Sequence, residues 1–453
     1  MSPSSVLHRS LHNEPLEVVS TKGQYLTLSS GHKVFDACGG AAVSCIGHCD
    51  PRVVSAIAKQ LETVDYIHSG HYTTSTVEQL STLILRDQST LAHALFVSSG
   101  SEAMESTLKL CRQYYVELEG KDTQRTQFVS RRQSYHGTTL GALGVGGHKF
   151  RRALFEPLLE QNNIHQISPC YAYRYQRGMT EEEYTNDLIQ ELEDTIVKVG
   201  AETVAAFIFE PVVGAALACV PATKDYMVKV RGVCDRHGIL MVCDEVMCGM
   251  GRCTDGVSLH AWKSLNPDIQ NESQIAPDIQ TVGKGLGGGY IPIAAVLVSK
   301  KVSNVLSSGS GTFMNGFTYQ AHPTSCAAAL SVQTIVKEDN LLARAADLGK
   351  LLQQQLEKIV GLPHVGNIRG AGLFWGVEFV KDTSTREPFE KSGAATTVAN
   401  SAFSDGVQVY VCEGVADGTI GDAIIFAPAY NCDEDDIRMI VEVVSSAIRE
   451  TFS

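Results

Sequence analysis

Lys284 is the residue in this sequence whose surroundings point most clearly to a catalytic role, because it lies between glycines directly after a strand-like run. Residues 279–282 are typical of a buried strand, and Gly283-Lys284-Gly285-Leu286-Gly287 follows. A lysine amine removed from water can become a nucleophile for imine chemistry. A dinucleotide-binding loop is disfavoured because the segment leads into another apolar run, at 293–298, and not into a helix. A Walker A loop is disfavoured because Gly285 stands where that motif has Ser or Thr.

Other polar residues also follow predicted strands directly. Gly100 and Ser101 come just after the apolar residues 95–97 and open a helical stretch. Backbone N–H groups at such a helix start can hold a phosphate, although an ordinary serine cap fits equally well. Glu210 and Asp244 each end an apolar run, where a carboxylate is costly unless it meets a cation. Each carboxylate taken singly is also compatible with a solvated position.

The combination of these residues points to one cofactor. Tyr135 adds an aromatic ring next to His136 and a glycine. Pyridoxal phosphate requires a lysine for the imine, a carboxylate opposite its pyridine nitrogen, an aromatic ring against its own ring, and donors for its phosphate. The sequence therefore predicts a pyridoxal phosphate site.

Alternating apolar runs and helical stretches between residues 51 and 330 are the elements that must position this site. They predict an α/β fold with a mostly parallel sheet covered by helices on both faces, whose ligands bind at the carboxyl ends of the strands. The predicted strands are 95–97, 127–129, 204–209, 239–243, 279–282 and 293–298.

We predict three parts in the chain. An N-terminal segment at 1–50 contains a hairpin and packs with the small domain, a large domain spans 51–330, and a small α+β domain spans 331–453. One long helical region is predicted at 326–360. Further strands are predicted at 374–379, 407–411 and 424–426, and surface loops near 264–275 and 300–312.

Composition limits the classes of partner. Of 453 residues, 44% are hydrophobic, and 37 basic against 50 acidic residues give a net charge of −13, so nucleic-acid binding is disfavoured. Apolar runs are too short to span a membrane. Thirteen cysteines without a C-x-x-C pair favour reduced thiols and a cytoplasmic location. Cys45, His48 and Cys49 are zinc-ligand types without a second pair, so we expect no metal.

The sequence resembles the class III pyridoxal-phosphate-dependent aminotransferases, which include ω-amino-acid transaminases and have the fold-type-I architecture. The resemblance runs from about residue 20 to the end of the chain. It rests on SSGSEAMESTLKL, YHG, FEPVVG, DEVMCGMGR, PDIQTVGKGLGGGYIPIAAVL and TYQAHPTSCAAAL, in family order. It implies a ping-pong reaction in which a primary amine or ω-amino acid gives its amino group to an oxo acid.

The resemblance also implies roles for individual residues. Lys284 matches the Schiff-base lysine, which also moves a proton, and Asp244 matches the partner of the pyridine nitrogen. Val246 and Tyr135 match the residues on the two faces of the cofactor ring. The remaining matches are Gly100 and Ser101 with the phosphate, Thr318 with a threonine that reaches the phosphate from the other subunit of a homodimer, and Glu210 with a glutamate that pairs reversibly with a substrate-binding arginine.

That arginine is where this sequence departs from the family. No Arg occurs between Arg386 and Arg438, and a bidentate carboxylate clamp is hard to replace by Lys. We therefore expect an altered carboxylate site. Arg252 is a candidate replacement for the missing arginine, although the resemblance implies a structural role for it. A decarboxylase, racemase or aminomutase on the same scaffold stays open, because the cofactor permits each of these reactions. A non-catalytic protein is disfavoured, since both Lys284 and Asp244 are present.

Overall fold

A seven-stranded sheet forms the centre of the larger part of the molecule. The computed structural model describes residues 5–160 and 162–453. The strand order is β4-β12-β11-β10-β7-β5-β6, with parallel pairing from β11 to β6. The strands are β4 (Leu91–Val97), β5 (Gln127–Arg131), β6 (Ile164–Ile167), β7 (Val204–Phe209), β10 (Leu240–Asp244), β11 (Ile279–Val282) and β12 (Ala294–Ser299). The α/β prediction is thus confirmed.

One strand runs against the others. β12 pairs antiparallel with both β11 and β4. The connection from β11 to β12 contains only a one-turn helix, η4 (Lys284–Leu286), and a parallel pair would need a longer crossover. The segment that carries Lys284 is therefore a tight return at one end of the sheet.

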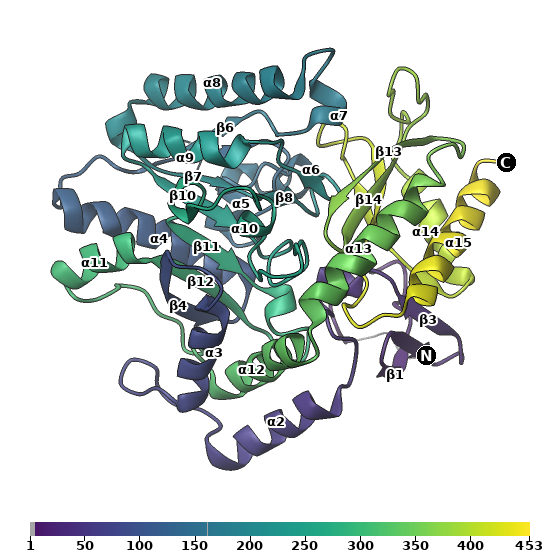
Figure 1. Cartoon of the computed structure of the whole chain (residues 1–453), viewed down its shortest axis with the longest axis horizontal. Helices are drawn as coiled ribbons and strands as arrows, with labels where there is room; N and C mark the ends of the chain where they lie inside the picture. The colour runs from purple at the N-terminus through teal and green to yellow at the C-terminus, as the bar shows by residue number, and fades with distance from the viewer. Residues whose placement is uncertain (1–4, 161) are drawn as a thin grey trace.

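Helices cover both faces of the sheet, as the continuous apolar strands predict (Figure 1). On one face, α4 (Gly100–Glu119) and α11 (Lys300–Ser308) pack against each other and against β12. On the other face, α8 (Glu181–Val199) and α9 (Tyr226–His237) form a second core with β7 and β10. All residues of β7 and β10 are buried, which explains why both strands are apolar apart from Asp244 at the end of β10.

Two sequence predictions were wrong in detail. Residues 300–308 form helix α11 and not a loop, because Ser299 caps its start and Val302 is buried on its inner face. The long helical region predicted at 326–360 is two helices, α12 (Pro323–Glu338) and α13 (Leu341–Glu357). Asn340, with a φ of +52°, lies between them in the left-handed region. The short strand β6, which contains His165 and Gln166, was not predicted.

The C-terminal part has its own four-stranded sheet, and the N-terminal segment pairs with this part of the chain. The order β13-β14-β17-β16 comprises β13 (Val365–Ala371), β14 (Phe374–Phe379), β17 (Asp422–Phe426) and β16 (Tyr410–Glu413). A second sheet joins β1 (Val18–Lys22), β2 (Tyr25–Leu28) and β3 (Lys33–Asp36) to β15 (Val407–Gln408). The predicted strand at 407–411 is thus divided between two sheets. Residues 1–4 of the predicted N-terminal segment lie outside the described residues.

The remaining elements are short or lie beside these sheets. The helices are α1 (Gly39–Ala42), α2 (Pro51–Thr63), α3 (Ser75–Leu85), α5 (Leu140–Val145), α6 (Lys149–Arg152), α7 (Ala172–Tyr175), α10 (Ala261–Ser264), α14 (Ala394–Ser404) and α15 (Glu434–Thr451). Single-turn helices are η1 (Glu156–Leu158), η2 (Ala201–Thr203) and η3 (Glu272–Gln274), and β8 (Val212–Val213) pairs with β9 (Val220–Pro221).

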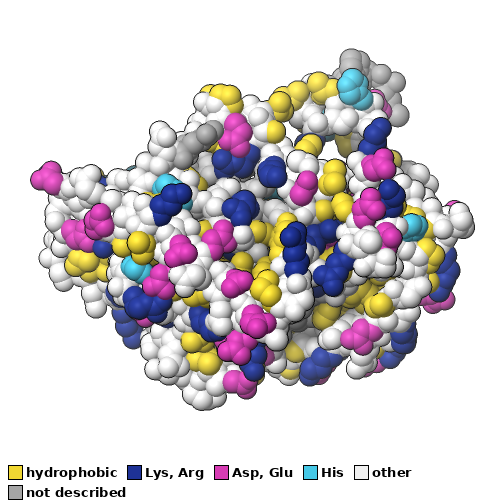
Figure 2. Space-filling view, turned by 90° about the horizontal axis from the view of Figure 1, so that it is seen from above, with side chains coloured by type: hydrophobic (Ala, Val, Ile, Leu, Met, Phe, Trp, Pro, Cys, Tyr) yellow, Lys and Arg dark blue, Asp and Glu magenta, His cyan; other side chains and the backbone are white. Residues whose placement is uncertain are grey.

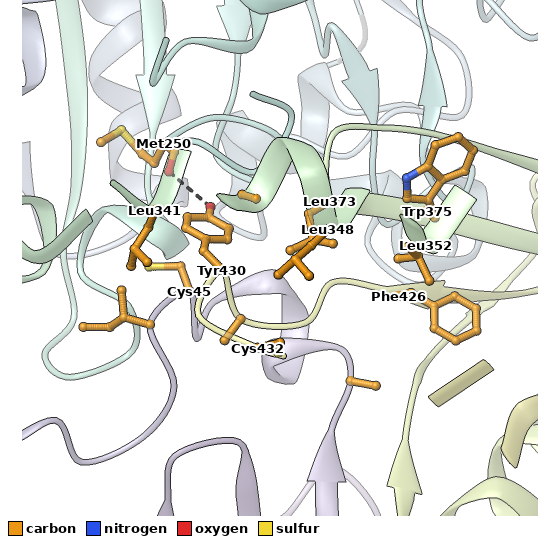
Figure 3. Close-up of a cluster of buried hydrophobic side chains, with 14 of the residues drawn as sticks. Cys45, Met250, Leu341, Leu348, Leu352, Leu373, Trp375, Phe426, Tyr430 and Cys432 are labelled. Carbon is orange, nitrogen blue, oxygen red and sulfur yellow. Dashed lines mark hydrogen bonds between the residues drawn. The ribbon is translucent and has the colours of Figure 1, made fainter. Parts of the chain in front are cut away.

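One hydrophobic core joins the three predicted parts of the chain (Figure 3). Tyr430 lies at its centre: its hydroxyl donates to the Met250 carbonyl at 3.1 Å, and its N–H donates to the Cys45 carbonyl at 2.7 Å. These contacts tie the C-terminal part to the large sheet and to the N-terminal segment. The boundaries of the three predicted parts stay a prediction.

Candidate active site

A cavity of about 380 Å³ lies at the carboxyl ends of the large sheet's parallel strands. This volume is within the range of small-molecule sites. Its lining includes seven of the eight residues predicted for the site, namely Gly100, Ser101, Tyr135, Glu210, Asp244, Val246 and Lys284. Thr318 is not among the lining residues. It is exposed, and its carbonyl accepts a hydrogen bond from the Tyr66 hydroxyl at 3.1 Å.

Lys284 enters the cavity from the tight return after β11. Its φ is +44°, in the left-handed region that a non-glycine residue adopts at a cost of about 1–3 kcal/mol. Burial lowers the pKa of its amine, while the Asp244 and Glu210 carboxylates oppose this shift. The neutral, nucleophilic amine is therefore populated at a lower pH than in an ordinary lysine.

Asp244 ends β10, and donors fix both of its carboxylate oxygens. Oδ2 lies 2.7 Å from Nδ1 of His136, while Oδ1 accepts from the Thr281 hydroxyl at 3.0 Å and the Val246 N–H at 3.1 Å. Asp244 and His136 are both buried. The carboxylate is thus held in one orientation at the wall of the cavity. His136 was noticed in the sequence only as part of the Tyr135 turn, and its contact with Asp244 is new.

Glu210 connects the Tyr135 turn to the strand β7. Its Oε1 accepts from the Tyr135 N–H at 3.0 Å, and its Oε2 accepts from the Gly214 N–H at 3.1 Å. Burial and the Asp244 charge raise the pKa of this carboxyl. Its carboxylate meets no arginine in the described part of the chain, so the reversible pairing stays a prediction. What the contacts do establish is that Glu210 fixes the backbone of Tyr135.

The start of helix α4 also lines the cavity. Ser99 caps the helix, since its hydroxyl accepts from the Glu102 N–H at 3.2 Å. The N–H groups of Gly100 and Ser101 belong to the first turn, where no acceptor exists within the helix, so they can bind an anion. The Ser101 hydroxyl accepts from the Thr138 N–H at 3.0 Å and so ties this turn to the segment after Tyr135.

Gly100→Ala is expected to weaken binding of a phosphate-bearing cofactor. An added Cβ would lie 2.9 Å from Cγ1 of Val246, so one of the two must move. Overpacking of this kind costs about 1–3 kcal/mol, so we expect the dissociation constant of pyridoxal phosphate to rise about 5- to 150-fold in a fluorescence titration. Gly361→Ala is the control, because its Cβ would have no heavy atom within 4 Å. Equal affinity of Gly100→Ala and wild type would contradict the placement of the phosphate.

Arg252 is a structural residue. It is buried, donates to the Leu373 carbonyl at 3.3 Å, and lies 4.7 Å from the centroid of the Tyr430 ring. It is not part of the cavity lining.

Cys45 and Cys49 contact separate groups. The Cys45 thiol donates to the Gly285 carbonyl at 3.3 Å, and the Cys49 thiol lies 3.3 Å from the Thr21 hydroxyl. Within residues 5–160 and 162–453, no cluster of three metal-ligating side chains occurs. The helices of the same residues include none with the length and apolarity needed to cross a membrane.

The fold and the site together are those of the fold-type-I transferases. This class combines a large mixed sheet, a smaller C-terminal part and a lysine at the end of a strand. The family model for class III aminotransferases matches residues 6–448. An aminotransferase of Gibberella zeae is 46% identical over 450 residues, which cover 98% of this chain and 85% of the relative. Gamma aminobutyrate transaminase 3 of Solanum lycopersicum is 34% identical over 458 residues, which cover 100% and 84% of the two chains.

A solved structure agrees with this classification. The amine transaminase of an uncultivated Pseudomonas species, in its PLP-bound form, superposes with a TM-score of 0.88 at 32% identity, covering 99% of this chain and 98% of that one. The protein belongs to the class III aminotransferase family, whose members depend on pyridoxal phosphate.

Proposed function

We propose that this protein binds pyridoxal 5′-phosphate in the cavity at Lys284 and transfers an amino group from a primary amine or ω-amino acid to an oxo acid by a ping-pong mechanism. The observation that carries the proposal is the meeting of the Lys284 amine, the Asp244 carboxylate and the first turn of α4 in one cavity. These groups fit the cofactor's aldehyde, pyridine nitrogen and phosphate in turn. When bound, the cofactor supplies an electron sink for the substrate carbon.

With the cofactor bound, each of the predicted residues would have a separate role. The Lys284 amine holds the cofactor and moves the proton of the substrate carbon that bears the amino group. Asp244, oriented by His136, keeps the pyridine nitrogen protonated. Tyr135 and Val246 hold the ring from its two faces, and the N–H groups of Gly100 and Ser101 hold the phosphate.

A panel of amine donors against pyruvate and 2-oxoglutarate, with products identified by mass spectrometry, tests this function. We expect a new amino acid and a new carbonyl compound in equal amounts from at least one pair. Absence of both from every pair, with the cofactor bound, would refute the proposal. Membership in the class III family favours amino transfer over decarboxylation, racemisation or an amino shift.

Within the same proposal, the protein is a homodimer in which Thr318 reaches the phosphate of the partner subunit. Thr318 is exposed between Met314 and Tyr319, whose side chains are 79% and 60% exposed. The Tyr319 ring packs against Tyr66, with ring centroids 6.2 Å apart, and Tyr72 is also exposed. Exposed aromatic and methionine side chains close together are typical of protein–protein interfaces.

Mixed dimers test this arrangement. Lys284→Ala and Thr318→Ala subunits are each expected to be impaired as homodimers. When the two are unfolded together and refolded, each hybrid dimer contains one site with both Lys284 and the partner's Thr318. We therefore expect activity to return in the mixture, up to about one quarter of the wild-type level per total subunit for random pairing. No recovery, with hybrid dimers demonstrated by differential tags, would show that Thr318 does not act across an interface.

We also propose a cytoplasmic location and no nucleic-acid partner. All thirteen cysteines are free, which suits a reducing compartment. On the face shown in Figure 2, basic and acidic side chains are interspersed, and the net charge is −13. Both features disfavour a surface that binds the phosphate backbone of a nucleic acid.

A further inference from the structure

We propose that Arg151 binds the carboxylate of the amino acceptor, in place of the arginine that residues 387–437 lack. This inference rests on the proposed function, because it assigns the acceptor-binding residue of that same site.

Arg151 lies beside a residue that lines the cavity. It belongs to the short helix α6, and its guanidinium carbon lies 4.5 Å from the centroid of the Tyr135 ring. Its charge also acts on Lys284, where it helps to lower the pKa of the amine. The guanidinium is therefore within electrostatic range of the atom at which the reaction takes place.

Arg151 also reaches the segment from which the family arginine is missing. Burial raises the pKa of the Tyr410 hydroxyl on β16, and the nearby Arg151 guanidinium opposes this shift. Its charge is felt by Cys412, two residues further along the same strand. Helix α6 thus supplies a cation near β16, whereas residues 387–437, which include β16, contain no arginine.

The Arg151 charge is available for a ligand. Among the residues that the structure describes, Arg151 forms no ion pair, whereas the neighbouring Arg152 pairs with Glu156 at 2.9 Å. A half-buried guanidinium without a carboxylate partner can bind a carboxylate with two parallel hydrogen bonds. Three other cations near this region, Arg132, Lys149 and Arg177, line a different cavity.

His148, which also lies beside Tyr135, is not a cation that could bind the acceptor carboxylate. The His148 ring packs edge-on against Tyr135, with centroids 6.5 Å apart. Burial, aided by the Arg151 charge, lowers the pKa of His148 to about 4, so this ring is neutral near pH 7. Arg151 is therefore the cation at this side of the site that can meet an oxo acid.

The test compares acceptors with and without a carboxylate. Arg151→Gln is assayed in the cofactor-loaded enzyme with pyruvate and with propanal, its uncharged counterpart, using benzylamine as a donor without a carboxylate. Loss of a charge-assisted pair predicts that kcat/KM for pyruvate falls about 10- to 100-fold, mainly through KM, while kcat/KM for propanal stays within about twofold. Arg151→Lys keeps the charge but not the bidentate geometry, so we expect partial recovery for pyruvate.

Arg438→Gln is the matched control, because Arg438 is exposed and pairs with Glu434 and Asp435 on its own helix. An unchanged KM for pyruvate in Arg151→Gln, or equal losses for pyruvate and propanal, would overturn this assignment and leave the proposed function intact. If wild type forms no product from any amine, the proposed function itself fails. If Arg151→Gln does not fold, Arg151→Lys is used in its place. A kcat/KM for pyruvate that falls relative to kcat/KM for propanal supports the assignment, and an unchanged ratio of the two overturns it.

Discussion

Lys284→Ala is expected to abolish amino transfer without unfolding the protein. Lys284 is the amine that meets the cofactor, and its lowered pKa makes the neutral form available. The variant loses the covalent attachment of the cofactor and the group that moves the proton. We therefore expect turnover to fall by at least the roughly 10²- to 10⁴-fold that a positioned acid–base group contributes.

Absorbance spectra of the purified variant, loaded with excess pyridoxal phosphate and titrated with amine, measure this effect. In wild type the visible band should change on adding amine, and in Lys284→Ala this change and the turnover should both be lost. Lys350→Ala is the control, since the Lys350 side chain is 72% exposed and pairs with the equally exposed Asp347 on the same helix. If both the spectral change and turnover persist without Lys284, another residue must do its chemistry.

Asp244→Asn is expected to leave the cofactor attached but to slow the reaction strongly. The substitution removes the negative charge that would keep the pyridine nitrogen protonated. It also places an amide at the position now fixed by His136 and Thr281. Removing one preorganised electrostatic group from an active site costs about 10²- to 10³-fold in kcat, and we expect a loss of this size here.

The measurement is kcat at saturating amine and oxo acid, with bound cofactor quantified in the same sample. Asp435→Asn serves as the control, because the Asp435 side chain is 95% exposed. A wild-type kcat in Asp244→Asn with full cofactor occupancy would show that the carboxylate has no part in the reaction. Loss of the cofactor itself would place the role of Asp244 in binding rather than in rate.

The central strands were predictable because both faces of the sheet are covered. β7 is buried along its whole length, so its sequence is a continuous apolar run with clear ends. β11 is also wholly buried, and its β-branched residues Ile279, Thr281 and Val282 favour a strand. β6 and β13 are only partly buried, and their polar residues hide the pattern. Helix α11 was taken for a loop because its outer face is polar and only Val302 is fully buried.

The cavity residues were predictable for a related reason. Asp244 ends β10 and Lys284 lies two residues after β11, and the carboxyl ends of parallel strands meet at one edge of the sheet. Arg151 was not found, because it belongs to a four-residue helix without a clear sequence pattern and approaches Tyr410 only through the tertiary fold. Thr318 was found through the family resemblance alone, because it is exposed and its proposed contact is with another subunit.

A single half-reaction tests the central claim most directly. The cofactor-loaded protein is mixed with excess amine donor and no oxo acid, and the carbonyl product is counted. A ping-pong transaminase should release about one carbonyl product per active site and then stop until pyruvate is added. Continued release of carbonyl product without any acceptor would contradict amino transfer by this protein.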